Sequence, residues 1–114
     1  MLEPSDIFAE VESARPVLRQ ALRSTFVGDD VKWLLTFGNG WALDERAQLT
    51  LYFDPDSIRR VIGTVWLPDH PWLGMLRAND ALQVRGRIRR VDAVSIELDV
   101  LELGIPSQQH DSDN

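Results

Sequence analysis

Residues 80–103 contain two adjacent runs in which apolar and polar side chains alternate. The first run places apolar residues or glycine at every second position: Leu82, Val84, Gly86 and Ile88. After a polar turn, the second run does the same at Ile96, Leu98 and Val100. A period of two is the repeat of a β-strand with one buried face, so the two runs predict a β-hairpin. The interior Gly86 predicts a sharp bend, as at the corner of a small barrel.

Three earlier segments also have strand patterns. Residues 31–37 and 47–53 alternate in the same way, and Trp33 falls on the inward phase of the first. Residues 58–67 are apolar on both faces. With the hairpin, these segments predict five strands. Because Asn-Gly readily adopts positive φ, Gly38-Asn39-Gly40 is expected to end the first strand.

Two other segments predict helix. Residues 5–26 carry an apolar stripe at helical spacing, with Ser5 as the expected N-cap. Pro16 interrupts this pattern, so the segment is expected either to kink or to split into two helices, with Ser13 capping the second. Residues 72–76 predict a short helical turn between the third and fourth strands.

The composition excludes several classes of protein. The chain has 114 residues, which predicts one domain, and it has no cysteine, which excludes disulfides, thiolate metal sites and a thiol nucleophile. No apolar run approaches the roughly 20 residues of a membrane helix, and the first residues lack the pattern of a signal peptide. We therefore expect a cytoplasmic protein without a membrane partner.

The charge is unevenly distributed around a net value of −6. Residues 77–90 hold five arginines, whereas residues 91–114 hold six acids and no base. In the predicted hairpin the arginines lie on the same side as the carboxylates, and one allowed register pairs Arg87 with Glu97 and Arg85 with Asp99. Such pairing neutralises the arginines and leaves little field for a phosphate backbone.

The segment from Leu76 to Ile88 resembles a known fold family. Its Asn79-Asp80 turn, followed by Leu82, Val84, Gly86 and Ile88, resembles small bacterial OB-fold domains of the tRNA-anticodon-binding-like group. The resemblance covers about residues 31–103 and implies a mainly β protein: a five-stranded, OB-like Greek-key barrel with an added N-terminal α-helix. The family often has a glycine that bends the first strand, where this chain has Trp33-Leu34-Leu35. A more open or differently curved barrel edge is therefore expected there.

The chain is expected to have three parts. Residues 1–26 are a helical segment that packs on the barrel, and residues 27–104 are the OB-like barrel itself. Residues 105–114 contain too few apolar side chains to pack and are predicted to be a disordered tail.

The resemblance also implies a binding surface. OB folds usually bind on the outer face of the second and third strands. On this chain the implied surface consists of Trp41, Tyr52, Arg59, Arg60, Trp66 and Arg90. In the sequence pattern, none of its three arginines, Arg59, Arg60 and Arg90, has an evident carboxylate partner. Trp41 and Trp66 are expected either to cap a barrel end or, if exposed together, to form an apolar patch that marks an interface.

The chain lacks the residue patterns of catalysis. Its two histidines, His70 and His110, have no nucleophile or ligand set at meaningful spacing, and no phosphate-binding or nucleophile motif occurs. We expect no enzyme activity, no cofactor and no metal. The predicted function is a binding module for protein recognition or self-association, including a homodimer. The alternative is binding of single-stranded RNA or DNA on the face of the second and third strands.

Overall fold

The computed structural model describes residues 2–106. Residues 1 and 107–114, which include His110 and most of the predicted tail, lie outside the described residues. The described residues contain five strands: β1 (Asp30–Leu43), β2 (Arg46–Tyr52), β3 (Arg60–Trp66), β4 (Ala81–Val91) and β5 (Ser95–Gly104).

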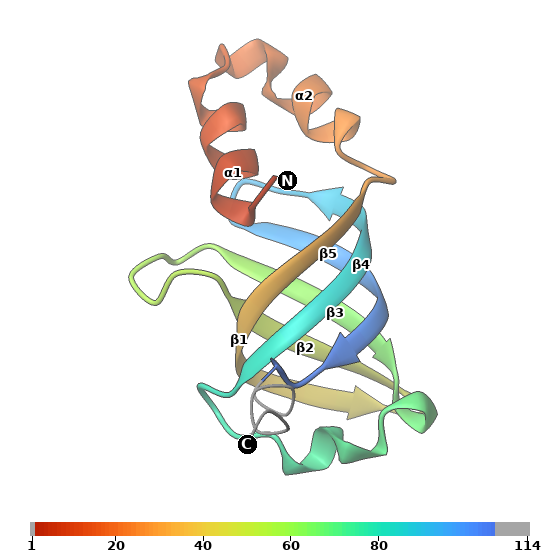
Figure 1. The fold of residues 1–114 in the computed structure, drawn as a ribbon. Coiled ribbons are helices and arrows are strands. Elements are labelled where there is room, and N and C mark those ends of the chain that lie inside the picture. Colours follow the sequence, from red (N-terminus) through yellow and green to blue (C-terminus); the bar gives the residue numbers. More distant parts are fainter. Residues whose placement is uncertain (1, 107–114) are drawn as a thin grey trace.

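The strands close into a barrel in the order β1-β2-β3-β5-β4, and β4 returns to β1 (Figure 1). The β3–β5 pair is parallel and the other pairs are antiparallel. This confirms the predicted fold class, a mainly β, five-stranded barrel of OB type with an N-terminal helix. Of the two alternatives expected for the edge at Trp33-Leu34-Leu35, a more open barrel is not formed, because the strands close into a barrel in which these residues pair with β4.

The first strand bends at a different place from the one expected. Gly38-Asn39-Gly40 does not end it, because β1 continues to Leu43 and the positive φ occurs at Asp44 (57°) in the turn that follows. Instead, Phe37 pairs with Leu51 and Asn39 with Thr50, so Gly38 is an extra, bulged residue. A bulge bends a strand and raises its twist, which supplies the curvature that closure requires.

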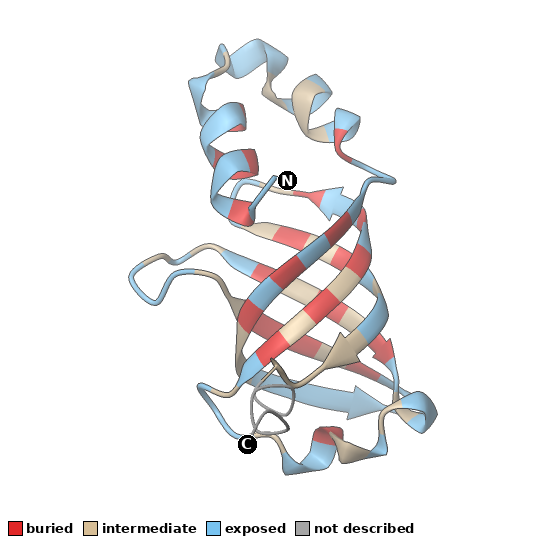
Figure 2. Cartoon of the chain, in the orientation of Figure 1, coloured by how far each residue is buried: buried red, intermediate tan, exposed pale blue. Residues whose placement is uncertain are grey.

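The inward-facing rows of the strands form one core, drawn in red along the strands in Figure 2. Trp33 is 1% exposed, as its phase predicted, and its indole Nε1 donates a hydrogen bond to the carbonyl oxygen of Leu2 at 2.7 Å. The most deeply buried partners from the other strands are Leu51, Val61, Leu82, Val84, Ile88, Ile96 and Leu98. Ile105, at the start of the predicted tail, also packs against this core.

The β4–β5 hairpin contains two compensating bulges. Arg85 pairs with Glu102 but Gly86 with Val100, so β5 has an extra residue opposite the predicted bend. Ile88 then pairs with Leu98 but Arg90 with Glu97, so Arg89 is extra in β4. The register named above as one that the pattern allows, with Arg87 opposite Glu97 and Arg85 opposite Asp99, is therefore not the one formed: Arg87 lies opposite Asp99 and Arg85 opposite Glu102.

The reason for the different register is burial at the end of β4. Val91 is 5% exposed and lies opposite Ile96. The inward residues earlier in β4, Leu82, Val84 and Ile88, have even numbers, so an unbroken alternation would turn Val91 outward. Val91 can turn inward only because Arg89 is an extra, bulged residue.

The N-terminal segment forms two helices, α1 (Pro4–Ser13) and α2 (Arg19–Thr25), joined by a 3₁₀ turn at residues 16–18. The break at Pro16 was predicted, but the caps were not. Glu3 is the N-cap of α1, and its amide donates to Asp6 Oδ2 at 2.9 Å, so Ser5 lies within the helix. Ser13 bonds back to the Glu10 carbonyl and does not cap α2.

Helical elements cover both ends of the barrel (Figure 1). At one end, α1 buries Ile7, Phe8 and Val11 in the same core as the strands. At the other, the predicted turn between β3 and β4 consists of 3₁₀ segments at Leu67–Asp69 and Pro71–Met75, which bury Leu73. Within residues 2–106, no helix is both long and apolar enough to cross a membrane.

Gly86→Ala tests whether the bend of β4 depends on the missing side chain. An added Cβ would lie 2.8 Å from the backbone oxygen of Asp99 and 3.3 Å from Leu98 Cβ, so the hairpin backbone would have to move. We expect a loss of about 1–3 kcal/mol in the free energy of unfolding, measured by urea denaturation. The matched control is Gly74→Ala, because a Cβ there meets nothing within 4 Å. Equal stabilities of the two variants would contradict the prediction.

Candidate binding surface

The outward-facing side chains of β2 and β3 form a band across the barrel, here called the β2–β3 band. The register places Arg46 opposite Trp66, Gln48 opposite Thr64 and Thr50 opposite Ile62. The same register continued by one step sets Tyr52 beside Arg60, whose guanidinium lies 5.7 Å from the centre of the tyrosine ring. Each end of the band therefore carries one aromatic ring and one arginine.

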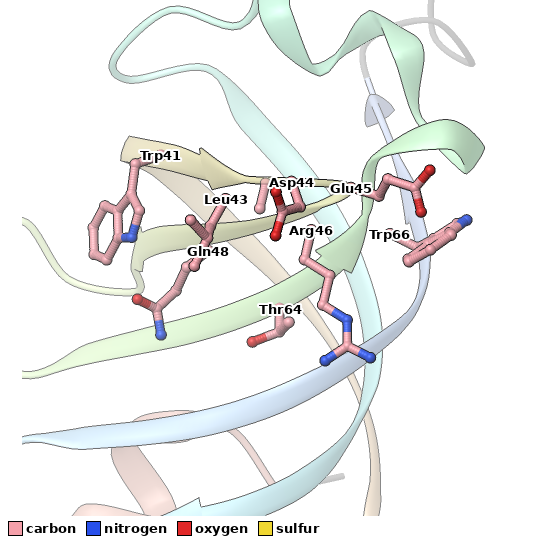
Figure 3. Close-up of a pocket in the computed structure, with 9 residues that line it drawn as sticks. Trp41, Leu43, Asp44, Glu45, Arg46, Gln48, Thr64 and Trp66 are labelled. Carbon is pink, nitrogen blue, oxygen red and sulfur yellow. The ribbon is translucent and has the colours of Figure 1, made fainter.

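One end of this band is hollowed into a groove of about 480 Å³ that continues onto β1. Trp41 and Trp66 stand at its two ends, with Leu43, Arg46, Gln48 and Thr64 between them (Figure 3). We call it the Trp groove. Trp41 is 57% exposed and Trp66 43% exposed, so two of the four tryptophans share one accessible surface. Their Cα atoms are two strands and two residues apart, about 12 Å by standard sheet spacings.

The bulge at Gly38 is what brings Trp41 to this surface. Before the bulge the inward residues of β1 have odd numbers, as in Val31, Trp33 and Leu35. After it, Ala42 pairs with the buried Ala47, and Trp41 pairs with the outward-facing Gln48. A shift of one residue moves every later side chain to the opposite face. Without the bulge, Trp41 would point into the barrel.

Arg59 lies just before β3, outside the β2–β3 band, and its side chain contacts α1. Its guanidinium forms an ion pair with Glu12 of α1 and lies 5.0 Å from the centre of the Phe8 ring. The expectation that Arg59 lacks a partner was wrong, because the fold places α1 against the start of β3, where residue 12 meets residue 59.

Arg90 was also expected to lack a partner, and this was wrong as well. Its Nε lies 3.1 Å from Asp92 Oδ2, and its Nη1 lies 3.9 Å from Glu97 Oε2. The bulge at Arg89 is the cause, since it places two successive arginines against one carboxylate. Arg90 therefore belongs to the closing hairpin and not to the band.

The remaining arginines of β4 are neutralised, as the sequence predicted, although by other partners. Arg85 Nη1 lies 2.6 Å from Glu102 Oε1, and Arg89 lies 3.0 Å from Glu97 and 3.6 Å from Asp99. Arg87 Nε is 4.0 Å from Asp30 Oδ1. All these side chains except Glu97 are largely exposed, so the pairs cancel charge more than they add stability.

Arg46 is not among the site residues predicted from the sequence, because the second strand was predicted to begin at residue 47. In the structure Arg46 is the first residue of β2 and lies opposite Trp66. Across the described residues, neither Arg46 nor Arg60 forms an ion pair with a carboxylate. Asp44 and Glu45 line the same end of the groove as Arg46. The signal that could have identified Arg46 is its even position, which it shares with Gln48 and Tyr52.

Tyr52 also borders a second hollow of about 390 Å³, with Thr36, Asp54, Pro55 and Asn79. Its ring lies over Gly38, where an added Cβ would come within 2.1 Å of Cε2. Tyr52 and Trp41 thus lie on one face but line different hollows. Among residues 2–106, no cluster of three or more potential metal ligands occurs.

Comparisons with known proteins bear on the fold. No family model matches the chain, and no curated protein has a similar sequence. One similar solved structure is the OBody AM1L10 bound to hen egg-white lysozyme, with 15% identity over 72% of this chain and 82% of that chain, and a TM-score of 0.59. Another is asparaginyl-tRNA synthetase from Pyrococcus horikoshii complexed with asparaginyl-adenylate, with 15% identity and a TM-score of 0.56. That match covers 76% of this chain but only 21% of the synthetase chain. At this identity the likeness shows a shared barrel fold.

Arg59→Ala tests the structural role of that residue. The variant loses the ion pair with Glu12 and the contact with the Phe8 ring, so we expect the free energy of unfolding to fall by about 1–2 kcal/mol. Urea denaturation measures the change. The matched control, Arg46→Ala, removes an exposed arginine without an ion pair and should change the value by less than about 0.5 kcal/mol. A similar loss in both variants would refute the assignment.

Proposed function

We propose that this chain is a non-catalytic binding module that recognises an extended segment of another protein in the Trp groove. The observation that carries the proposal is the exposure of Trp41 and Trp66 at the two ends of one groove. Tryptophan is one of the residue types enriched among the side chains that dominate binding energy at protein interfaces. Exposed apolar side chains that share one patch mark a site of interaction with a partner.

The charge around the groove defines the chemistry of the partner. Asp44 and Glu45 border it with Arg46 as the one cation among its lining residues, and the chain carries a net charge of −6. The arginines of β4 add little positive field because carboxylates oppose them. An apolar side chain flanked by lysine or arginine therefore fits the groove better than an acidic segment does.

The size of the groove sets the length of the segment. An extended chain rises about 3.3 Å per residue, so about four residues span the distance between the two tryptophans. The partner segment would lay one apolar side chain against each ring. One of the similar solved structures, the OBody, is bound to another protein, which supports a protein partner for a barrel of this shape.

A screen of short random peptides against the full chain tests this function. We expect the bound peptides to be enriched in an aromatic or aliphatic residue next to lysine or arginine. For the best labelled peptide, Trp66→Ala should raise the Kd about 30-fold, as measured by fluorescence anisotropy. The matched control is Leu34→Ala, since Leu34 is 60% exposed on the outer face of β1 but outside the groove. Enrichment of acidic peptides, or equal losses in both variants, would refute the proposal.

A second candidate function is the binding of single-stranded nucleic acid along the β2–β3 band. The observation that favours it is the pairing of Arg46 with Trp66 and of Arg60 with Tyr52, because stacked bases need rings and phosphates need unpaired cations. An asparaginyl-tRNA synthetase is among the proteins that share the fold. The net charge of −6 repels a phosphate backbone, so nucleic-acid binding is the second candidate.

A salt titration of oligonucleotide binding separates the two functions. If the second is correct, a labelled oligonucleotide binds at low salt, and its affinity falls steeply as salt is added. Arg60→Ala should then lower the salt slope by about one unit, while Arg85→Ala should leave it unchanged because Glu102 already opposes Arg85. A lack of oligonucleotide binding at low salt removes this candidate.

A further inference from the structure

The last part of β1 has one unpaired edge. β1 pairs with β4 over Asp30–Thr36 and with β2 over Thr36–Leu43. On the β4 side the pairing ends at Phe37, whose amide donates to the Asp80 carbonyl and whose carbonyl accepts from the Asn79 amide. Residues 39–43 have no backbone partner on that side within the described part of the chain, and all five are exposed. We call residues 39–43 the free edge; in Figure 2 they lie in the pale blue end of β1.

The direction of the backbone groups on the free edge follows from the turn. Leu43 and Arg46 close a two-residue turn, and the pair that closes such a turn is hydrogen-bonded. Leu43 therefore directs its N–H and C=O toward β2, and by alternation Trp41 and Asn39 do so too. Gly40 and Ala42 direct theirs away from β2, toward the open side.

The free edge lacks the devices that keep exposed strands apart. Natural sheets protect such edges with charged residues, with proline or with a covering element. The sequence here is Asn-Gly-Trp-Ala-Leu, with no charge and no proline, although the chain as a whole is strongly acidic. The outer row of β4, by comparison, carries arginine at positions 85, 87 and 89.

We infer that the free edge pairs with the same edge of a second copy, antiparallel, with a two-fold axis at Trp41. Gly40 then exchanges hydrogen bonds with the partner's Ala42, and Ala42 with the partner's Gly40. Trp41 lies opposite the partner's Trp41 in a pair without hydrogen bonds, where side chains come closest and aromatic pairs stabilise best. The surface is self-complementary, as a two-fold interface requires.

The pairing also places no like charges against one another. The residue that follows the free edge, Asp44, would lie beside the partner's Gly38, so the carboxylates of the two turns stay apart. Leu43 would lie beside the partner's Asn39. The interface is short, which places it in the weak, concentration-dependent class. Because Trp41 also lines the Trp groove, this dimer would bring the grooves of the two copies close together. Formation of the dimer does not depend on what the groove binds.

Sedimentation equilibrium of the full chain tests this inference. The mass should rise from monomer toward dimer as the protein concentration increases. Trp41→Arg sets two guanidinium groups against each other at the axis and should keep the chain monomeric, with an unchanged circular dichroism spectrum because Trp41 is largely exposed. The matched control, Trp66→Arg, changes the other groove tryptophan away from the edge and should still dimerise. A wild-type chain that stays monomeric at every concentration overturns the inference, and so does equal loss in both variants.

Cross-linking provides an independent measurement. The chain has no cysteine, so Trp41→Cys introduces a single thiol that faces its own copy across the axis. Cα atoms of directly opposed residues lie about 4.5–5.5 Å apart, which suits a disulfide. Mild oxidation should give a covalent dimer, whereas Gln48→Cys, next to Trp41 on β2 but away from the edge, should not. Equal yields would overturn the inference while leaving the proposed function of the groove intact.

Discussion

Closure of five strands around one core governs the other features of this structure. Each strand must keep an apolar row inside while the sheet curves through a full turn. The chain meets this requirement with bulges at Gly38 in β1, at Arg89 in β4 and opposite Gly86 in β5. Each bulge bends its strand and shifts its phase by one residue. The positions of the exposed side chains follow from those shifts.

The surface electrostatics are a consequence of the same bulges. The bulge at Arg89 lets Val91 reach the core and sets both Arg89 and Arg90 against Glu97. The hairpin holds four of the eleven arginines, together with four carboxylates, and is thereby close to neutral. The arginines without carboxylate partners on the β2–β3 band, Arg46 and Arg60, lie beside aromatic rings. This face therefore offers a partner mainly aromatic rings, with two unpaired arginines beside them.

The surfaces proposed for binding come from the length of β1. Because β1 continues past its last pairing with β4, its final residues keep a neighbour on one side only. The bulge at Gly38 turns Trp41 outward in this segment, where it borders the Trp groove and also lies at the centre of the free edge. One local irregularity thus accounts for both proposed interfaces. Trp66 belongs only to the groove, so the two can be separated by experiment.

The alternation in the sequence was enough to predict that five strands form, most of their inward rows and the burial of Trp33, because a period of two depends only on neighbours along the chain. It also determined that the arginines and carboxylates of the hairpin share one face. Which arginine meets which carboxylate follows only from the tertiary structure. The register depends on bulges, and the positions of the bulges depend on the burial of other residues, such as Val91. The ion pair between Arg59 and Glu12 of α1 also follows only from the tertiary structure, since the two residues are far apart in the chain. The same is true of the exposure of Trp41. An unbroken alternation along β1 would turn Trp41 into the barrel, and only the pairing of β1 with β2 reveals the extra residue at Gly38 that turns it outward.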